Sequence, residues 1–230
     1  MRLSSSPLPR FFAIAAVALV ALTLAWRPVS GILAAPAAWL AATTMRTLFP
    51  DWVRSAKGGA GRLEVETRLT VKPSRQQIAE ATRAGQQIPE GAVAELVLEA
   101  DPSLPGYGLP ILLALLLAAR GKRLIPRALL GAACLVPFQA YCLVTELLKQ
   151  AAITSGAAAQ TGFSALQINV IAYAYQLGAL LVPTLAPILI WVWLDRAFFA
   201  AVVLEGWLER EITQKGAEGR WSRRGPGRWR

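Results

Sequence analysis

Four apolar runs, separated by polar or basic segments, dominate the pattern of the chain. They cover residues 11–26, 107–119, 128–148 and 168–194. A transmembrane helix needs about 20 mainly apolar residues to cross a hydrocarbon layer of about 30 Å. The last two runs meet this length, the first is slightly short, and the second could just span when residues 104–106 are included. The pattern therefore predicts four membrane crossings.

The N-terminal region allows a second interpretation. A basic start, an apolar run and the small-residue pattern Ala35-Pro36-Ala37 loosely fit a cleaved signal peptide. This site is late in the chain and Arg27 interrupts the approach to it, so a retained first crossing is favoured. Residues 31–44 are apolar but short and contain Pro36. We expect an interfacial or re-entrant helix there rather than another crossing.

Residues 51–101 differ from the rest of the chain because they carry many charges of both signs. Residues 63–71 alternate apolar and polar side chains, the period of a half-buried strand, and residues 92–100 predict a second strand. Between them, a helix is expected from Ser74, a candidate N-cap, to Gly85. A small sheet capped by this helix is too small to bury much core without support from the membrane region.

The predicted fold class is a mainly α membrane protein: a bundle of about four transmembrane helices with a small α+β extracytoplasmic domain inserted between the first and second crossings. Residues 1–50 are expected to form an N-terminal transmembrane anchor plus an interfacial helix, and residues 51–103 the α+β domain. Residues 104–195 would form a three-helix transmembrane region, and residues 196–230 a basic cytoplasmic tail.

Basic residues cluster in the short segments that flank the apolar runs. The 230 residues include 24 Lys and Arg against 14 Asp and Glu, a formal net charge of +10. Because Lys and Arg in short loops stay on the cytoplasmic side, their distribution predicts cytoplasmic termini and, in a bacterium, the inner membrane. Trp221 and Trp229 among the terminal arginines could stack on nucleic acid, but lipid headgroups are the favoured partner and no nucleic acid is expected. The residues assigned to the membrane interface are Arg120, Lys122, Arg123, Arg127, Arg223 and Arg224.

The composition excludes several common classes of catalytic site. The chain has no histidine, which excludes Ser-His-Asp and Cys-His catalytic systems and histidine-ligated metals. Its two cysteines, Cys134 and Cys142, are eight positions apart in one predicted helix, about 80° around its axis, so neither a disulfide nor a metal site is expected. We predict no catalytic residues, no metal site and no cofactor.

Polar residues inside the last two crossings are the main candidates for function, because polar groups in hydrocarbon are costly. Gln139 and Glu146 are seven positions apart on one helix, and Asn169, Tyr173 and Gln176 share a face of the other. The favoured interpretation is an interhelical polar seam that holds the two helices together. One alternative is a binding groove near the outer leaflet, in which Glu146 attracts a cationic or hydrogen-bonding group on a substrate or partner helix. Less favoured is a role for Glu146 as a general acid or base.

Several segments resemble the exosortase H-associated membrane proteins. The resemblance depends on Glu95-Leu-Val-Leu-Glu99 followed by Gly106-Tyr-Gly-Leu-Pro110, and on Ala172-Tyr-Ala-Tyr-Gln-Leu-Gly178 followed by Pro183 and Pro187. It covers about residues 11–199. The resemblance implies a bacterial inner-membrane protein that accompanies an exosortase, a transpeptidase-like membrane enzyme acting on proteins with a C-terminal sorting signal. It implies no catalytic residues for this chain.

The predicted function is that of a non-enzymatic accessory protein of an exosortase-type sorting and envelope export system. Its expected partners are membrane lipids and an exosortase or the C-terminal helix of the sorted substrate. One alternative is a small polytopic transporter or membrane enzyme that uses Glu146. Another is a lipid-binding scaffold that depends on residues 216–230.

Overall fold

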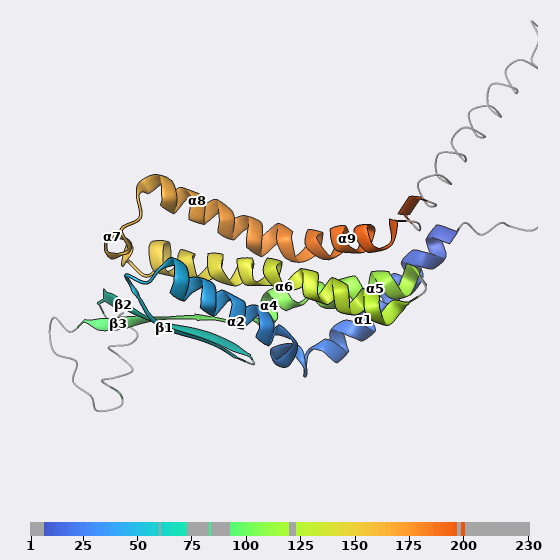
Figure 1. The fold of residues 1–230 in the computed structure, drawn as a ribbon, viewed down its shortest axis with the longest axis horizontal. Coiled ribbons are helices and arrows are strands. Elements are labelled where there is room, and N and C mark those ends of the chain that lie inside the picture. The colour runs from blue at the N-terminus through green and yellow to red at the C-terminus, as the bar shows by residue number, and fades with distance from the viewer. Residues whose placement is uncertain are drawn as a thin grey trace, which may run out of the picture.

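The computed structural model of the chain describes residues 7–59, 61–72, 83, 93–119, 123–196 and 199–200. The protein is mainly helical and elongated, with a small antiparallel sheet at one end (Figure 1). Its elements are α1 (Pro7–Trp26), α2 (Ser30–Leu48), β1 (Val53–Gly59), β2 (Arg62–Val71), β3 (Ala94–Ala100), α4 (Ser103–Gly106), α5 (Gly108–Ala119), α6 (Leu124–Lys149), the π-helix η1 (Gln150–Thr154), α7 (Ala158–Thr161), α8 (Ala165–Gln176), the π-helix η2 (Leu177–Leu181) and α9 (Val182–Leu194).

At one end, called here the helical end, α1, α5, the first half of α6 and α9 pack side by side (Figure 1). Their common core contains Phe11 of α1, Leu112 and Leu116 of α5, Leu135 of α6 and Trp191 of α9. The rings of Phe11 and Trp191 stack with their centroids 5.6 Å apart. The outer surfaces of these helices remain apolar: Val17 and Leu189, for example, are exposed.

Among the described residues, three helical stretches are long and apolar enough to cross a membrane: Pro9–Trp26, Leu124–Thr154 and Ala165–Leu194. These correspond to the first, third and fourth predicted crossings. The second predicted crossing forms the shorter apolar stretch Ser103–Ala119. The count of three candidate spans therefore differs from the predicted four.

The other end, called here the sheet end, combines the strands with α2, α8 and the second half of α6 (Figure 1). The strand order is β1-β2-β3, and both pairings are antiparallel, with Val65 opposite Ala56 on one side and Leu98 on the other. The predicted alternation in residues 63–71 is confirmed through Thr70, because Leu63, Val65, Thr67 and Leu69 are buried.

Strand β1 was not expected from the sequence. It contains Gly58 and Gly59 and lacks a run of β-branched residues, so it carries little strand signal. Gly58 is required for packing, because a Cβ at this position would collide with the backbone carbonyl of Ala38 in α2. Alanines on the buried face of α2 and this glycine allow the helix to approach the sheet closely.

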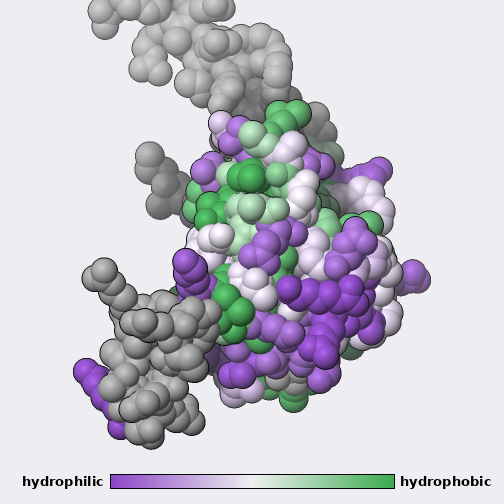
Figure 2. Space-filling model, turned by 90° about the vertical axis from the view of Figure 1, so that its left-hand side faces the viewer, coloured by the Kyte–Doolittle hydropathy of each residue, from purple (hydrophilic) through white to green (hydrophobic). Residues whose placement is uncertain are grey.

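The sheet shares its core with helices. Met45 of α2, Leu63 and Leu98 of the strands, and Leu143 and Leu147 of α6 belong to one buried cluster. On the outside, the sheet end carries charged side chains, among them Arg54, Lys57, Arg62 and Arg68, and a broad hydrophilic area is visible there in Figure 2. This end thus has a hydrophilic outer surface and a core that it shares with α2 and α6.

Two sets of helix boundaries differ from the sequence prediction. The segment expected as an interfacial helix, 31–44, is longer and runs as α2 over the sheet. The helices also extend beyond the third and fourth apolar runs, 128–148 and 168–194: α6 continues through Lys149 into η1, and α8 begins at Ala165 after a capping box between Ser164 and Gln167. The predicted helix at 74–85 lies outside the described residues apart from Arg83, and the tail at 196–230 lies outside them apart from residues 196 and 199–200.

Candidate functional site

A groove opens where the helical end meets the sheet end. Toward the helical end α5 packs against α9, and an added Cβ at Gly108 would lie 3.1 Å from the carbonyl oxygen of Pro183. On the other side of this contact, a cavity of about 430 Å³ is lined by α4, α6 and η2 together with the end of β3. Leu104 and Ala179 at its edge are exposed. The groove therefore opens on the side of the bundle.

The glycines around the groove serve close packing. Glycine and proline in Gly106-Tyr-Gly-Leu-Pro110 are typical of a sharp turn, but Tyr107 has helical angles, with φ −64° and ψ −12°, between α4 and α5. An added Cβ at Gly106 would lie 2.5 Å from Cζ2 of Trp26. The motif therefore brings α4 and α5 against α1 and α9 and leaves a nearly continuous helix.

Both π-helical segments of the described chain contribute to this groove. Gln150 of η1 and Gly178 and Ala179 of η2 line it. Such segments hold well under 1% of residues in soluble globular proteins and are frequent at functional sites. Their convergence on one cavity distinguishes it from an ordinary packing defect.

Proline explains the position of η2. In π geometry the carbonyl of Gly178 would accept the N–H of residue 183, but residue 183 is proline and has no N–H. The freed carbonyl instead accepts a hydrogen bond from the thiol of Cys142, with an S–O distance of 3.0 Å. This contact joins α6 to η2 at the wall of the groove.

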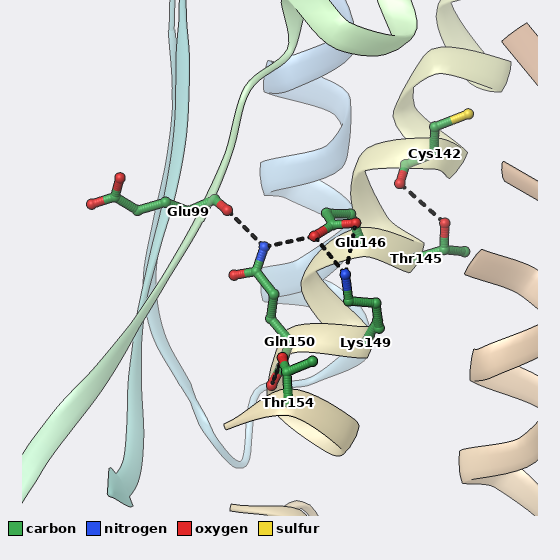
Figure 3. Close-up of polar contacts among 7 residues, drawn as sticks. All are labelled: Glu99, Cys142, Thr145, Glu146, Lys149, Gln150 and Thr154. Atoms are coloured by element: carbon green, nitrogen blue, oxygen red, sulfur yellow. Dashed lines mark hydrogen bonds and ion pairs between the residues drawn. The ribbon is translucent and has the colours of Figure 1, made fainter. Parts of the chain in front are cut away.

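A polar network lies at the sheet-side rim of the groove (Figure 3). The ammonium of Lys149 donates to Oε1 of Glu146 at 3.2 Å, and Nε2 of Gln150 donates to the same oxygen at 3.0 Å. Nε2 of Gln150 also donates to the backbone carbonyl of Glu99 at 2.8 Å, while the Glu99 carboxylate points away from α6 (Figure 3). Lys149 lies over the ring of Tyr175, 4.2 Å from its centroid. Glu146 thus connects α6, β3 and α8 through its neighbours.

The five residues of the predicted seam do not come together. Gln139 is buried, 8% exposed, and lines a small second cavity, and Glu146 lies at the groove. Asn169, Tyr173 and Gln176 share one face of α8 as predicted, but that face is exposed and points away from α6. Among the described residues, none of the three forms a side-chain hydrogen bond with Gln139 or Glu146.

The opposite face of α8 meets α6. The hydroxyl of Tyr141 donates to the carbonyl of Ala174 at 3.0 Å, and Gly178 lies against Thr145. Ala174 and Gly178 are four apart, the small-residue spacing that lets membrane helices approach closely. This spacing was the signal in the sequence that could have identified the inner face, and with it Tyr175, which sequence reasoning missed.

The predicted interface cations have different surroundings. Arg127 forms an ion pair with Asp195 of the α9 terminus, with 2.9 Å between Nη1 and Oδ1, so its guanidinium has an internal partner that was not predicted. Arg123 precedes α6 and is exposed. Arg120, Lys122, Arg223 and Arg224 lie outside the described residues. Within the described ranges, no group of three or more His, Cys, Asp or Glu side chains could hold a metal ion.

Comparison with known families gives a match over most of the chain. A family model described as exosortase H-associated membrane protein matches residues 5–198. This range includes the elements from α1 to α9, and with them the groove and the exposed face of α8. No curated protein and no solved structure matches the chain.

Proposed function

Because the chain belongs to the exosortase H-associated membrane protein family, we propose that it is a non-enzymatic accessory subunit that binds an exosortase through the exposed face of α8. The family model covers most of the chain, which makes it a membrane protein associated with exosortase.

We place the bilayer around the helical end. The stretches Leu124–Thr154 and Ala165–Leu194 contain 31 and 30 residues, so at 1.5 Å per residue each is about 45 Å long. A hydrocarbon layer of about 30 Å takes only about 20 of these residues. If one surface of the hydrocarbon layer lies at the ion pair of Arg127 and Asp195, counting 20 residues along each helix puts the other surface near Leu147 and Tyr175. Helix α1, with 20 residues, ends at Trp26 on the same side.

This placement puts the sheet end outside the hydrocarbon. The basic segments at the helical end then lie on the cytoplasmic side of a bacterial inner membrane, and the sheet faces the extracytoplasmic side. Both termini are cytoplasmic when Ser103–Ala119 also crosses, a stretch of 17 residues that is at the lower limit for spanning.

The exposed face of α8 is the surface that we propose contacts the partner. Leu166, Val170 and Tyr173 are 74%, 58% and 72% exposed, and in this placement they extend about 13 Å beyond the hydrocarbon. Asn169 adds an amide to the same face. A contiguous apolar face outside the lipid is typical of a protein interface, and aromatic residues such as Tyr173 are enriched there.

The direct test is recovery of the exosortase with tagged protein in mild detergent. Val170→Lys and Tyr173→Lys place a charge on an exposed face, so folding should be unchanged while recovery falls at least about tenfold. Val93→Lys is the matched control, because Val93 is also exposed, 63%, but precedes β3. Equal recovery of exosortase with all three variants would contradict the proposed surface.

The alternative, a small transporter or membrane enzyme, depends on the Glu146 carboxylate. Lys149 and Gln150 already hold this carboxylate on the rim of the groove, which favours a binding or structural role. Glu146→Gln separates the two functions. It should leave exosortase recovery unchanged for an accessory subunit, and it should abolish the activity of a transporter or enzyme that uses this acid.

A further inference from the structure

The groove lies at the depth where hydrocarbon changes to headgroups, if the bilayer is placed as proposed above. From Arg127, Leu143 is about 24 Å along α6 and Gln150 about 35 Å, on either side of a boundary near 30 Å. Both residues line the groove. A lipid beside α4 and η2 would present its headgroup and upper acyl chains to this opening.

The size of the groove fits one small amphiphile. Its volume of about 430 Å³ lies within the range of about 300–1,000 Å³ that is usual for sites of small ligands. A helix with side chains has a diameter of about 10 Å, which this volume does not accommodate. The occupant is therefore a single small molecule or part of one.

The lining changes from polar to apolar along the groove. At the sheet side it contains Asp101, Glu146 and Gln150, and at the helical side it contains Leu143, Ala179 and Pro183. The exposed edge at Leu104 and Ala179 connects the apolar part with the side of the bundle. A molecule with a polar head and an apolar tail fits this order when its head faces the sheet.

The charged residues that line the groove indicate which kind of headgroup can bind. Among the described lining residues, the charged ones are Glu99, Asp101 and Glu146, all acidic. The Glu99 carboxylate points away, Asp101 accepts a hydrogen bond from the N–H of Ser103 at 2.8 Å, and Glu146 is paired with one ammonium, that of Lys149. Two carboxylates against one ammonium leave an excess negative charge. A cationic hydrogen-bond donor on the ligand would neutralise it.

We infer that this groove binds one phospholipid with a primary ammonium in its headgroup, of the phosphatidylethanolamine class. The ammonium donates to the carboxylates of Glu146 and Asp101, and the acyl chains leave the groove between Leu104 and Ala179. A phosphatidylcholine headgroup has no N–H to donate, and a phosphatidylglycerol headgroup has no cation. The groove therefore prefers phosphatidylethanolamine over both.

The test uses the full chain in vesicles of equal parts phosphatidylethanolamine, phosphatidylcholine and phosphatidylglycerol. After extraction in mild detergent, native mass spectrometry identifies the lipid retained by the protein. We expect phosphatidylethanolamine to be enriched about tenfold over phosphatidylcholine, the change expected from one charge-assisted hydrogen bond. Ala179→Phe fills the groove and should remove the bound lipid, whereas Leu180→Phe, at a neighbouring residue that is 71% exposed and outside the groove, should retain it.

Glu146→Gln supplies a second variant that removes the charge and keeps the shape, and it should abolish the preference over phosphatidylcholine. Retained lipid with the composition of the vesicles would overturn the inference, as would unchanged enrichment in both Ala179→Phe and Glu146→Gln. Exosortase recovery is a separate readout. Loss of lipid preference in Glu146→Gln with normal exosortase recovery supports the groove as a lipid site. Enrichment of phosphatidylethanolamine in an unchanged protein that recovers no exosortase leaves the lipid site standing without the accessory role.

Discussion

At the scale of single residues, the ion pair of Arg127 and Asp195 is the clearest case in which a buried charge is stabilised by its partner. The Asp195 side chain is 7% exposed, and among the described residues its Oδ2 accepts no hydrogen bond. Arg127→Leu would leave a buried carboxylate without its cation, a change that typically costs about 3–5 kcal/mol. We expect a clear fall in the thermal unfolding temperature in detergent.

Arg54→Leu is the control for that variant. Arg54 pairs with Glu95 at 3.2 Å, but both side chains are 61% exposed, and exposed pairs contribute about 0–1 kcal/mol. The two variants lose the same chemical group. If the unfolding temperature falls equally in Arg127→Leu and Arg54→Leu, the Arg127 ion pair is not buried as described.

Gly58 and Gly59 offer a comparison between neighbouring residues. A Cβ at Gly58 would collide with backbone atoms of Ala38 and Trp39, whereas a Cβ at Gly59 meets nothing within 4 Å. Because backbone cannot move aside as a flexible side chain does, Gly58→Ala should destabilise the protein by about 1–3 kcal/mol. Gly59→Ala should change stability by less, and the thermal unfolding of both variants measures the difference. Equal stability would show that α2 does not pack on β1 as closely as described.

Residue roles were only partly predictable from the sequence. Glu146 was identified because a carboxylate in an apolar run stands out, and the structure places it at the groove. Asn169, Tyr173 and Gln176 were correctly assigned to one face, but their periodicity does not say whether that face points inward or outward. The spacing of Ala174 and Gly178 decides this, because small residues mark the side of close contact.

At the scale of elements, the apolar runs predicted the long helices and the alternating run predicted β2. The predictions failed where packing between elements outweighed the local sequence preference for a strand or a loop. Strand β1 has a weak strand sequence and is held by its pairing with β2 and by α2. The segment after Lys149 contains small and polar residues typical of a loop, yet Ala151 and Ala152 are buried and extend α6 as η1.

The π-helix η2 gives a prediction for Pro183. Pro183→Ala restores an N–H that can bond to the carbonyl of Gly178, in competition with the thiol of Cys142. The S–H stretching band of Cys142 in the infrared should then move to higher frequency, since the thiol loses its acceptor. Pro187→Ala restores an N–H elsewhere on α9 and should leave the band in place. An unchanged band in Pro183→Ala would contradict the proline explanation of η2.

At the scale of the whole molecule, the sheet depends on the helices. Its buried residues Leu63 and Leu98 share one cluster with Met45 of α2 and Leu147 of α6. A fragment of residues 51–103 lacks both helices, and a chain of this size buries too little surface to fold alone. We expect its amide resonances to lack dispersion in solution. A dispersed spectrum would show that the sheet is an independent domain.

The overall arrangement followed from the sequence only in outline. Hydropathy indicates membrane helices and a polar insertion, but it does not show that the sheet lies beside one end of two helical stretches, each about 45 Å long and longer than a hydrocarbon layer of about 30 Å. With the bilayer placed as proposed, the extra length puts the groove at the membrane surface and the face of Tyr173 outside the hydrocarbon. Both consequences depend on distances between elements far apart in the chain.

The central claim is that the exposed face of α8 binds an exosortase, and site-specific photocrosslinking tests it most directly. A photoreactive phenylalanine at Tyr173 replaces one exposed aromatic residue with another, and the same group at Val93 is the control. Illumination in native membranes should produce an adduct with an exosortase from position 173 and none from position 93. If position 173 yields no exosortase adduct while the protein is correctly inserted, α8 is not the contact surface and the account is wrong.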